Sequence, residues 1–397
     1  MTMATVEFDP TRKKTPHVVR WRDEQGKQRK KGFPRKLDAK NYRTEIEHQL
    51  NTGTYTDPKA GRITFEVYAE QWRAIQPHRP NTAARTKSQL TKHVYPVLGA
   101  RPIGQLRHSE LQAFVNGLPV SASSVRPIWA TVRAILRTAV VDRLITFDPC
   151  AKVQLPELPI REHNFVRLTV DQVDAVTEAM PPRYRALVVV GAMSGLRQGE
   201  LFGLEVGDIE FLHRPPRVNV CRQVQPATGG GTELCRLKNR HSYRKVPVGK
   251  EAIEVLAAHL AAFPPGDGVE MLDTTGPRPV TRSARLMFTD GDDRALHRNR
   301  FNKYVWDPAR KAAGLPGEAT MHDLRHFYAS ALIFKGRSAN TVAARLGHAD
   351  PTTTWKFYAG LWPDEEELSA QDVDDTFAEA RAARASRVPT VCPSDGA

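Results

Sequence analysis

The chain has 397 residues, enough for about two to four domains. Lysine and arginine outnumber aspartate and glutamate by 58 to 44, which gives a formal charge of +14 and favours a phosphate-rich partner. The sequence contains no run of about 18 apolar residues and no apolar core of a secretory signal near its start, which argues against a membrane protein and predicts a cytoplasmic one.

The cysteines also argue against a metal-binding or disulfide-bonded protein. They are far apart and form no pair of the metal-ligating type, so we expect reduced thiols and no metal or other cofactor. The four are Cys150, Cys221, Cys235 and Cys392.

Residues 1–62 predict a small α+β domain with an excess of basic side chains. Its expected elements are a strand at His17–Arg22, a turn at Asp23–Lys27, a strand at Gln28–Phe33 and a helix at Leu37–Leu50. Two strands are predicted, and a third is possible. Basic residues alternate with Trp21 and Phe33, which indicates a DNA-binding face; a merely solvated strand pair is the alternative.

Residues 63–160 predict an all-helical domain of about 100 residues. Helical spacing occurs near 63–77, 81–97, 108–118 and 123–143, and Thr64 is suited to cap the first helix. Proline and the absence of periodicity predict a linker at Cys150–Asn164.

Residues 161–363 predict a mainly helical domain with a small antiparallel sheet. Strands are expected at Arg217–Val224 and Leu234–Val248, around a glycine-rich loop that lacks the features of a phosphate-binding loop. Helices are expected near 297–313, 322–335, 339–346 and 351–359. The tail, 364–397, is acidic, and Asp364–Ala385 could form one amphipathic helix.

The third domain carries short polar segments that suit phosphate chemistry. Arg197 follows a glycine turn and opens a helix, and Glu200 can face it across one turn. A guanidinium matches phosphate oxygens and stays charged. His322 and Arg325 are spaced to share a helix face, and Lys238 near a strand end could bind phosphate or donate a proton.

Two further segments follow near the end of this domain. His348 lies between a glycine and a helix-breaking Asp-Pro pair, and Tyr358 follows ten residues later on an expected C-terminal helix. Taken singly, each of these segments is more often an ordinary structural feature, so only their combination is informative.

In this order and spacing, the segments resemble the tyrosine recombinase family of phage integrases, over about residues 63–360. The segment from Lys238 to Pro247 also resembles that family's Lys-Thr-x-x-Ser-x-Arg-x-Val-Pro pattern, with Asn239 where threonine is usual. The resemblance implies a tyrosine recombinase fold and site-specific DNA breakage and rejoining through a 3′-phosphotyrosyl link.

The resemblance also implies roles for individual residues. Tyr358 would be the nucleophile, His322 its base and Lys238 the acid for the departing 5′-oxygen. Arg197, Arg325 and His348 would hold the phosphate, with Glu200 as support. Two neighbouring arginines should favour the phenolate form of Tyr358.

The partners implied are double-stranded DNA with core-type and arm-type sites, a homotetramer on synapsed DNA, a host DNA-bending protein and an excisionase. Residues 1–62 resemble an arm-binding domain, which favours an integrase over a chromosome-dimer resolvase, and the acidic tail could pack on a neighbouring protomer. A type IB topoisomerase, which shares this chemistry, and a DNA-binding regulator that has lost activity are two rival functions.

Overall fold

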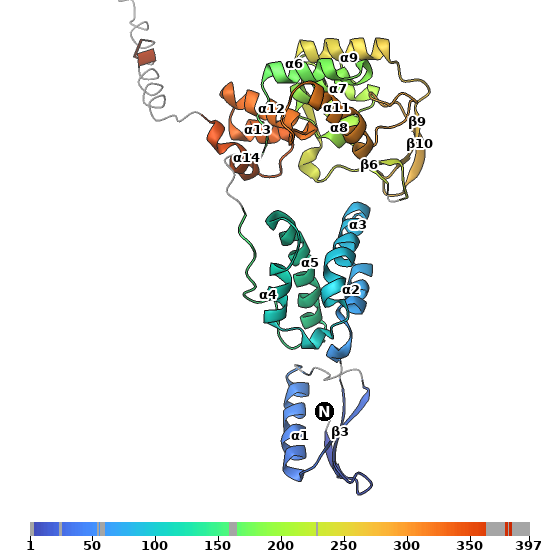
Figure 1. Ribbon diagram of the computed structural model, residues 1–397, viewed down its shortest axis with the longest axis vertical. Coiled ribbons are helices and arrows are strands. Elements are labelled where there is room, and N and C mark those ends of the chain that lie inside the picture. Colours follow the sequence, from blue (N-terminus) through green and yellow to red (C-terminus); the bar gives the residue numbers. More distant parts are fainter. Residues whose placement is uncertain are drawn as a thin grey trace, which may run out of the picture. The chain divides into compact units, whose positions relative to one another are not determined.

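The computed structural model describes residues 4–23, 26–53, 55, 60–158, 165–227, 229–362, 378–379 and 381–382. The chain divides into two compact units, Met1–Ile160 and Arg161–Ala397 (Figure 1). In these ranges no helix is both long and apolar enough to cross a bilayer. The helix predicted at Asp364–Ala385 falls almost wholly outside the described residues.

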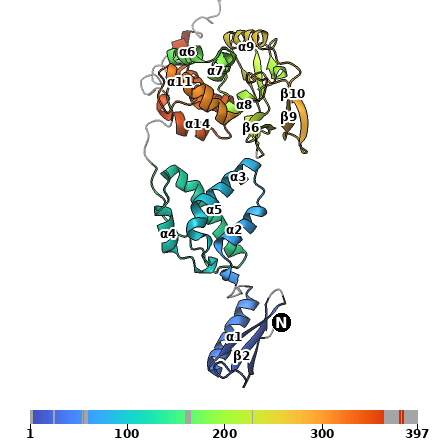
Figure 2. The same cartoon turned by 45° about the vertical axis from the view of Figure 1, so that its right-hand side comes forward.

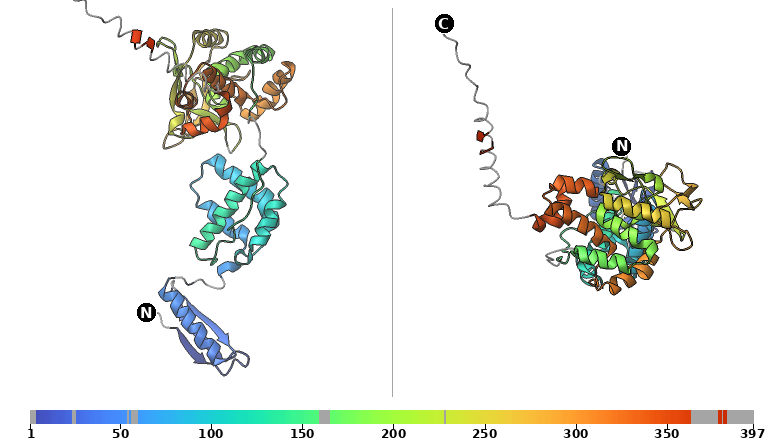
Figure 3. Two further views of the ribbon diagram at one scale, coloured as in Figure 1. Left: turned by 90° about the vertical axis from the view of Figure 1, so that its left-hand side faces the viewer. Right: turned by 90° about the horizontal axis from the view of Figure 1, so that it is seen from above.

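The first part of unit 1 is a three-stranded antiparallel sheet with one helix. Its elements are β1 (Thr5–Phe8), β2 (His17–Arg22), β3 (Gln28–Phe33) and α1 (Lys36–Asn51), with strand order β1-β2-β3. The two predicted strands and the helix are confirmed, and β1 is the third strand. Helix α1 lies across one face of the sheet (Figure 3, left), where Trp21 is buried and donates a hydrogen bond to Tyr55 at 3.0 Å.

The second part of unit 1 is helical, as predicted. It consists of α2 (Phe65–Ala74), α3 (Pro80–Gln89), a π-type continuation at Leu90–Gly99, α4 (His108–Asn116) and α5 (Ala122–Val141). The Thr64 side chain accepts a hydrogen bond from the Val67 amide and caps α2. The apolar faces of these helices form one core around Trp72 and Trp129, and the Trp72 indole donates to Thr138 at 3.1 Å.

Unit 2 is mainly helical, and its described helices enclose one large apolar core and a second, smaller apolar cluster near residue 358. They are α6 (Val170–Ala179), α7 (Pro182–Ser194), α8 (Gln198–Phe202), α9 (Lys250–Ala262), α10 (Arg298–Phe301), α11 (Asp307–Ala312), α12 (Met321–Phe334), α13 (Ala339–Leu346) and α14 (Pro351–Tyr358). A π-type turn at Asn302–Trp306 joins α10 to α11, which accounts for the helix predicted near 297–313.

The strands of unit 2 form two small sheets. One has the order β4-β5-β8 and the other β10-β9-β7-β6, in which the β7–β9 pair is parallel (Figure 2). The strands are β4 (Ile209–Glu210), β5 (Arg217–Val220), β6 (Gln223–Pro226), β7 (Thr232–Cys235), β8 (Arg244–Pro247), β9 (Val269–Asp273) and β10 (Val280–Ala284).

Two of the strand predictions were too long, and the hairpin β9–β10 was not predicted. Arg217–Val224 breaks into β5 and β6 where Arg222 turns to form ion pairs with Glu205 and Asp208. Leu234–Val248 breaks into β7 and β8, because the Asn239 side chain caps a 3-10 turn between them. The halves of each predicted strand therefore belong to different sheets.

Candidate active site

Arg197 is positioned by a tight turn and a buried carboxylate. Gly195 ends α7 with φ of +63°, and a Cβ there would come within 2.4 Å of the Tyr328 ring. Arg197 then starts α8, and its backbone N–H and Nη1 both donate to Glu200, at 3.0 and 2.7 Å. The predicted pairing of Arg197 with Glu200 is therefore confirmed.

Glu200 is the anionic centre of this part of the site and is only 1% exposed. Its second oxygen accepts from Arg244 Nη2 at 2.9 Å, so one carboxylate serves two guanidinium groups. Burial alone would raise the pKa of Glu200, but the charges and hydrogen bonds of Arg244 and Arg197 outweigh burial and hold the pKa below its usual value. Glu200 is therefore ionised at neutral pH.

Arg325 lies on α12, is 2% exposed and is held by two backbone carbonyls. Its Nη1 donates to Gly195 O at 2.7 Å and its Nη2 to Leu346 O at 2.5 Å. Burial and the neighbouring Arg197 charge lower its pKa from the usual guanidinium value. A buried cation beside a second cation favours the approach of an anion such as a phosphate.

His322 and His348 lie near the same arginines. His322 is in the first turn of α12, and its pKa is lowered to about 4 by the loss of surrounding water and by the Arg325 charge. His348 follows α13 and shares a hydrogen bond of 2.9 Å between its Nδ1 and Thr354. Its pKa is also lowered to about 4, first by burial and then by Arg325 and Arg197. Both rings are neutral at pH 7.

Tyr358, at the end of α14, is 2% exposed and packs in a small apolar cluster. Its Oη lies 2.5 Å from His326 Nδ1, and Phe165 stacks on the His326 ring at 4.3 Å between centroids. Burial raises the pKa of Tyr358 above its usual value, and Arg325 opposes this only in part. The Arg325 charge therefore favours the phenolate, as predicted, but desolvation outweighs it and the net pKa is raised.

Lys238 is exposed and lies on the segment that follows β7. Its neighbour Asn239 accepts hydrogen bonds from the backbone N and the Oγ of Ser242, both at 2.9 Å. Ser242 Oγ in turn lies 3.5 Å from Arg197 Nη1. Asn239, where the family pattern has threonine, thus fits as a turn cap, and this turn connects the Lys238 segment to Arg197.

The fold brings together most of the residues predicted for the site. Electrostatic interactions connect Arg197, His322, Arg325 and His348, and Arg325 also acts on Tyr358. Among the residues that the structure describes, Lys238 is connected to this group through the turn at Asn239–Ser242. In the described ranges, no cluster of three or more His, Cys, Asp or Glu side chains could hold a metal ion.

Sequence reasoning did not assign roles to three residues of the site. His326 contacts Tyr358, Arg244 shares Glu200 with Arg197, and Thr354 contacts His348. For His326, the adjacent His-x-x-Arg-His pattern was a visible signal. Arg244 matches the arginine of the family pattern at Lys238–Pro247, but its contact with Glu200 joins positions 44 residues apart and was not visible in the sequence. No comparable motif marked Thr354, which lies six residues after His348.

Comparison with known proteins agrees with this geometry. Residues 166–363 match the phage integrase family, and residues 65–155 match the phage integrase central domain. The prophage phiRv2 integrase of Mycobacterium tuberculosis is 25% identical over 346 residues, which cover 86% of this chain and 87% of the relative.

Two solved structures share the fold. The Tn1549 transposon integrase bound to transposon right end DNA has a TM-score of 0.66 at 20% identity and covers 80% of this chain and 100% of its own. A lambda integrase tetramer bound to a Holliday junction has a TM-score of 0.53 at 19% identity, and the match covers 87% of this chain and 96% of the lambda integrase chain. On these matches and the arrangement around Arg325, the chain belongs to the phage integrase family and is a site-specific tyrosine recombinase acting on DNA.

Proposed function

We propose that this recombinase integrates a phage or mobile-element genome, and excises it with accessory factors, through a 3′-phosphotyrosyl intermediate on Tyr358. The observation that supports the proposal is the contact of the phenol with α12, where its Oη lies 2.5 Å from Nδ1 of His326, the residue that follows Arg325. Electrostatic interactions connect Arg325 with Arg197, His322 and His348. A phosphate entering this group would meet two guanidinium groups and two neutral imidazoles, and a nucleophile on the adjoining helix.

Arg197, Arg325 and His348 would bind the scissile phosphate and stabilise its transition state. As Tyr358 Oη bonds to phosphorus and the bond to the 5′-oxygen breaks, negative charge grows on the non-bridging oxygens. Preorganised donors at such a position typically contribute about 10²–10³ in rate each. Glu200 orients Arg197 through two hydrogen bonds and so supports this clamp.

Proton transfer would involve His322 as the base for Tyr358 and Lys238 as the acid for the leaving 5′-oxygen. The phosphate's negative charge would raise the pKa of the nearby histidines, which the arginines now hold low, so the rings become better proton acceptors when DNA binds. His326 is a second candidate base, since its Nδ1 already contacts the phenol.

The reverse reaction would complete strand exchange. A free 5′-hydroxyl from the partner strand attacks the phosphotyrosyl bond, which releases Tyr358 and restores the phosphodiester. The bond energy is kept in the covalent link, so the exchange requires no nucleotide hydrolysis.

The partners would be core-type and arm-type attachment sites, a homotetramer on synapsed DNA, a host DNA-bending protein and an excisionase. The basic three-stranded domain at the N-terminus would bind the arm-type sites. Its presence favours an integrase over a chromosome-dimer resolvase. The domain division proposed is 1–62, 63–160 and 161–363, followed by the tail 364–397.

The test uses a nicked attachment-site duplex, from which the strand end diffuses away after cleavage and leaves the covalent complex. We expect a denaturant-stable adduct whose peptide map contains Tyr358, and none with Tyr358→Phe. Tyr304→Phe, which changes an exposed tyrosine of the same unit, is the matched control and should form the adduct. An adduct that persists in Tyr358→Phe would overturn the assignment.

A further inference from the structure

The segment that carries Lys238 is held by strand pairing and hydrogen bonds from the hairpin β9–β10. Strand β7, which ends three residues before Lys238, pairs in parallel with β9, with Leu234 opposite Asp273. Directly after β9, both the backbone N–H and the Oγ1 of Thr274 donate to Leu234 O, each at 2.8 Å. One residue therefore holds the end of β7 through two donors.

A second set of contacts lies closer to Lys238. Arg236 Nε donates to the carbonyl of Thr275 at 2.6 Å, and the Gln223 side chain donates to Arg236 O at 2.7 Å. Arg236 is two residues before Lys238. The backbone that leads into Lys238 is thus held from β6 on one side and from the turn after β9 on the other.

The hairpin itself is anchored to the part of the fold that carries Arg197. Arg282 on β10 donates to Asp273 at 2.6 Å and to both oxygens of Glu205, at 2.6 and 3.1 Å. Glu205 also pairs with Arg222 at 3.0 Å. Glu205 lies shortly after α8, the helix that starts at Arg197, so these ion pairs connect the hairpin to the phosphate-binding side of the site.

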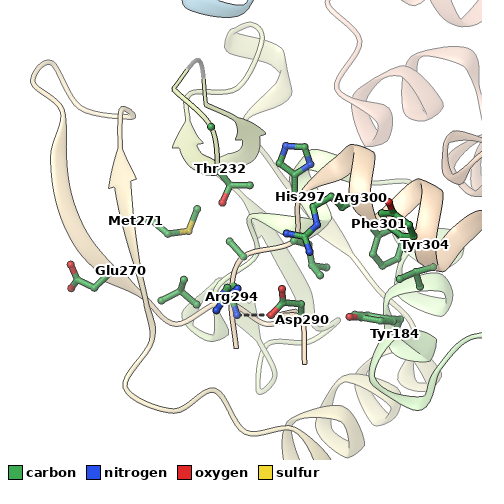
Figure 4. Close-up of a pocket in the computed structure, with 16 residues that line it drawn as sticks. Tyr184, Thr232, Glu270, Met271, Asp290, Arg294, His297, Arg300, Phe301 and Tyr304 are labelled. Carbon is green, nitrogen blue, oxygen red and sulfur yellow. Dashed lines mark hydrogen bonds between the residues drawn. The ribbon is translucent and has the colours of Figure 1, made fainter. Parts of the chain in front are cut away.

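A cavity lies next to the start of β7. Its volume is about 720 Å³, and it separates the start of β7, at Thr232, from α10 (Figure 4). Met271 on β9 and His297 and Arg300 next to or on α10 also line it. Within the described residues, the strands that pair with β7 are β6 and β9.

We infer that the hairpin β9–β10 is a brace that positions Lys238 for proton delivery to the leaving 5′-oxygen, with Thr274, Arg236 and Arg282 as positioning residues. This inference rests on the proposed role of Lys238. When Tyr358 Oη bonds to phosphorus, the bond to the 5′-oxygen breaks and the Lys238 ammonium transfers its proton to that oxygen. Lys238 lies on a loop and has a long flexible side chain, so the position of its backbone determines how often the ammonium reaches the oxygen.

The test separates proton delivery from the other steps by changing the leaving group. A DNA substrate with sulfur in place of the bridging 5′-oxygen releases a thiolate, whose conjugate acid has a pKa of about 8.5, so departure does not need an acid. The double variant Thr274→Val, Arg236→Met removes the hydroxyl and guanidinium contacts and keeps the β9 backbone. We expect single-turnover cleavage of the oxygen substrate to fall about tenfold, with the sulfur substrate cleaved at the wild-type rate.

Three controls make the result specific. Thr281→Val changes an exposed threonine of β10 and should leave both rates unchanged. When Thr274→Ser replaces Thr274→Val in the double variant, the hydroxyl contact returns and should restore part of the rate on the oxygen substrate, while Arg236→Met still removes the contact with Thr275. Arg282→Met, which cuts the hairpin from Glu205, should behave like the double variant, and a thermal unfolding curve shows that each protein is folded.

Lys238→Ala separates a failure of this inference from a failure of the proposed function. Its cleavage rate on the oxygen substrate should fall by about 10² or more, and its rate on the sulfur substrate should return to the wild-type value. If it does not recover, Lys238 is not the acid, and the proposed role and the inference both fall. A different result would refute only the brace. In that case, Lys238→Ala recovers its rate on the sulfur substrate, but the hairpin variants cleave both substrates equally slowly or cleave both at the wild-type rate.

Discussion

The phenol of Tyr358 and the imidazole of His326 share a hydrogen bond of 2.5 Å in the interior of the catalytic unit. Phe165 stacks on the imidazole and also touches the phenol ring, with centroids 5.3 Å apart. Burial, together with the charges of His322 and Arg325, lowers the pKa of His326 to about 3, so this ring is neutral at pH 7. The phenol of Tyr358 is therefore held in a hydrogen bond with a neutral imidazole.

We predict that this hydrogen bond stabilises α14. Replacing either partner by phenylalanine leaves the other polar atom buried and unsatisfied, which costs about 1–3 kcal/mol. Hydrogen exchange across Pro351–Tyr358 should therefore be faster in Tyr358→Phe and in His326→Phe, while the double variant should be less affected than the sum of the two. His259→Phe, which removes a buried histidine bonded to Met287 O, is the control and should leave exchange of α14 unchanged. If the effects of the two single variants on hydrogen exchange added up fully in the double variant, the prediction would be contradicted.

We predict that the stability of the catalytic unit falls as the pH drops below about 6.5. The pKa of His326 is about 3 in the folded protein and near 6.5 when unfolded, so between these values only the unfolded chain takes up the proton. The free energy of unfolding then decreases by about 1.4 kcal/mol per pH unit for this one ring.

Urea unfolding at pH 5.0 to 7.5 measures this effect. Below pH 6.5, the free energy of unfolding of His326→Phe should depend on pH less steeply than that of wild type, by the equivalent of about one proton. Above pH 7, the two plots of unfolding free energy against pH should be parallel. Equal slopes at all pH values would mean that His326 is protonated in the folded state.

We predict that Glu200→Gln is strongly destabilising. It keeps the shape of the side chain but leaves the guanidinium groups of Arg197 and Arg244 without their shared counter-charge. Breaking a buried ion pair from one side costs about 3–5 kcal/mol, and urea unfolding measures it. Sulfate should recover part of the loss by supplying an anion. Glu210→Gln removes an exposed pair with Lys245 and should have little effect; a loss similar to that of Glu200→Gln would show that burial is not the cause.

We predict that Thr354 acts on catalysis by orienting His348. Its side chain is fully buried and lies 2.9 Å from His348 Nδ1, which leaves Nε2 for the phosphate. Thr354→Val keeps the volume and loses the hydroxyl, so we expect adduct formation to slow about tenfold with DNA affinity unchanged. Thr353→Val, one residue away on the same helix, is the matched control. A loss of affinity equal to the loss of rate would show that Thr354 supports binding and not orientation.

Local sequence patterns were enough to predict many of the secondary-structure elements and one side-chain pair of the site. Helical periodicity and a capping threonine predicted α2, alternation predicted β2, and the turn after β2 predicted β3, because these signals depend on neighbours within a few residues. The pairing of Arg197 with Glu200 was also visible, since three positions along a helix bring two side chains together. The ordered set of polar residues identified the family.

The tertiary structure alone decided the electrostatic state of the site. The effect of burial on the Tyr358 phenol and the contact with His326 depend on packing between α12, α14 and Phe165, which are separated in the chain. Likewise, the hairpin β9–β10 contacts β7 across about 40 residues of sequence, and this contact helps to hold the Lys238 segment. Sequence patterns report local backbone preference, whereas a pKa or a brace depends on which distant groups exclude water from an atom or donate to it.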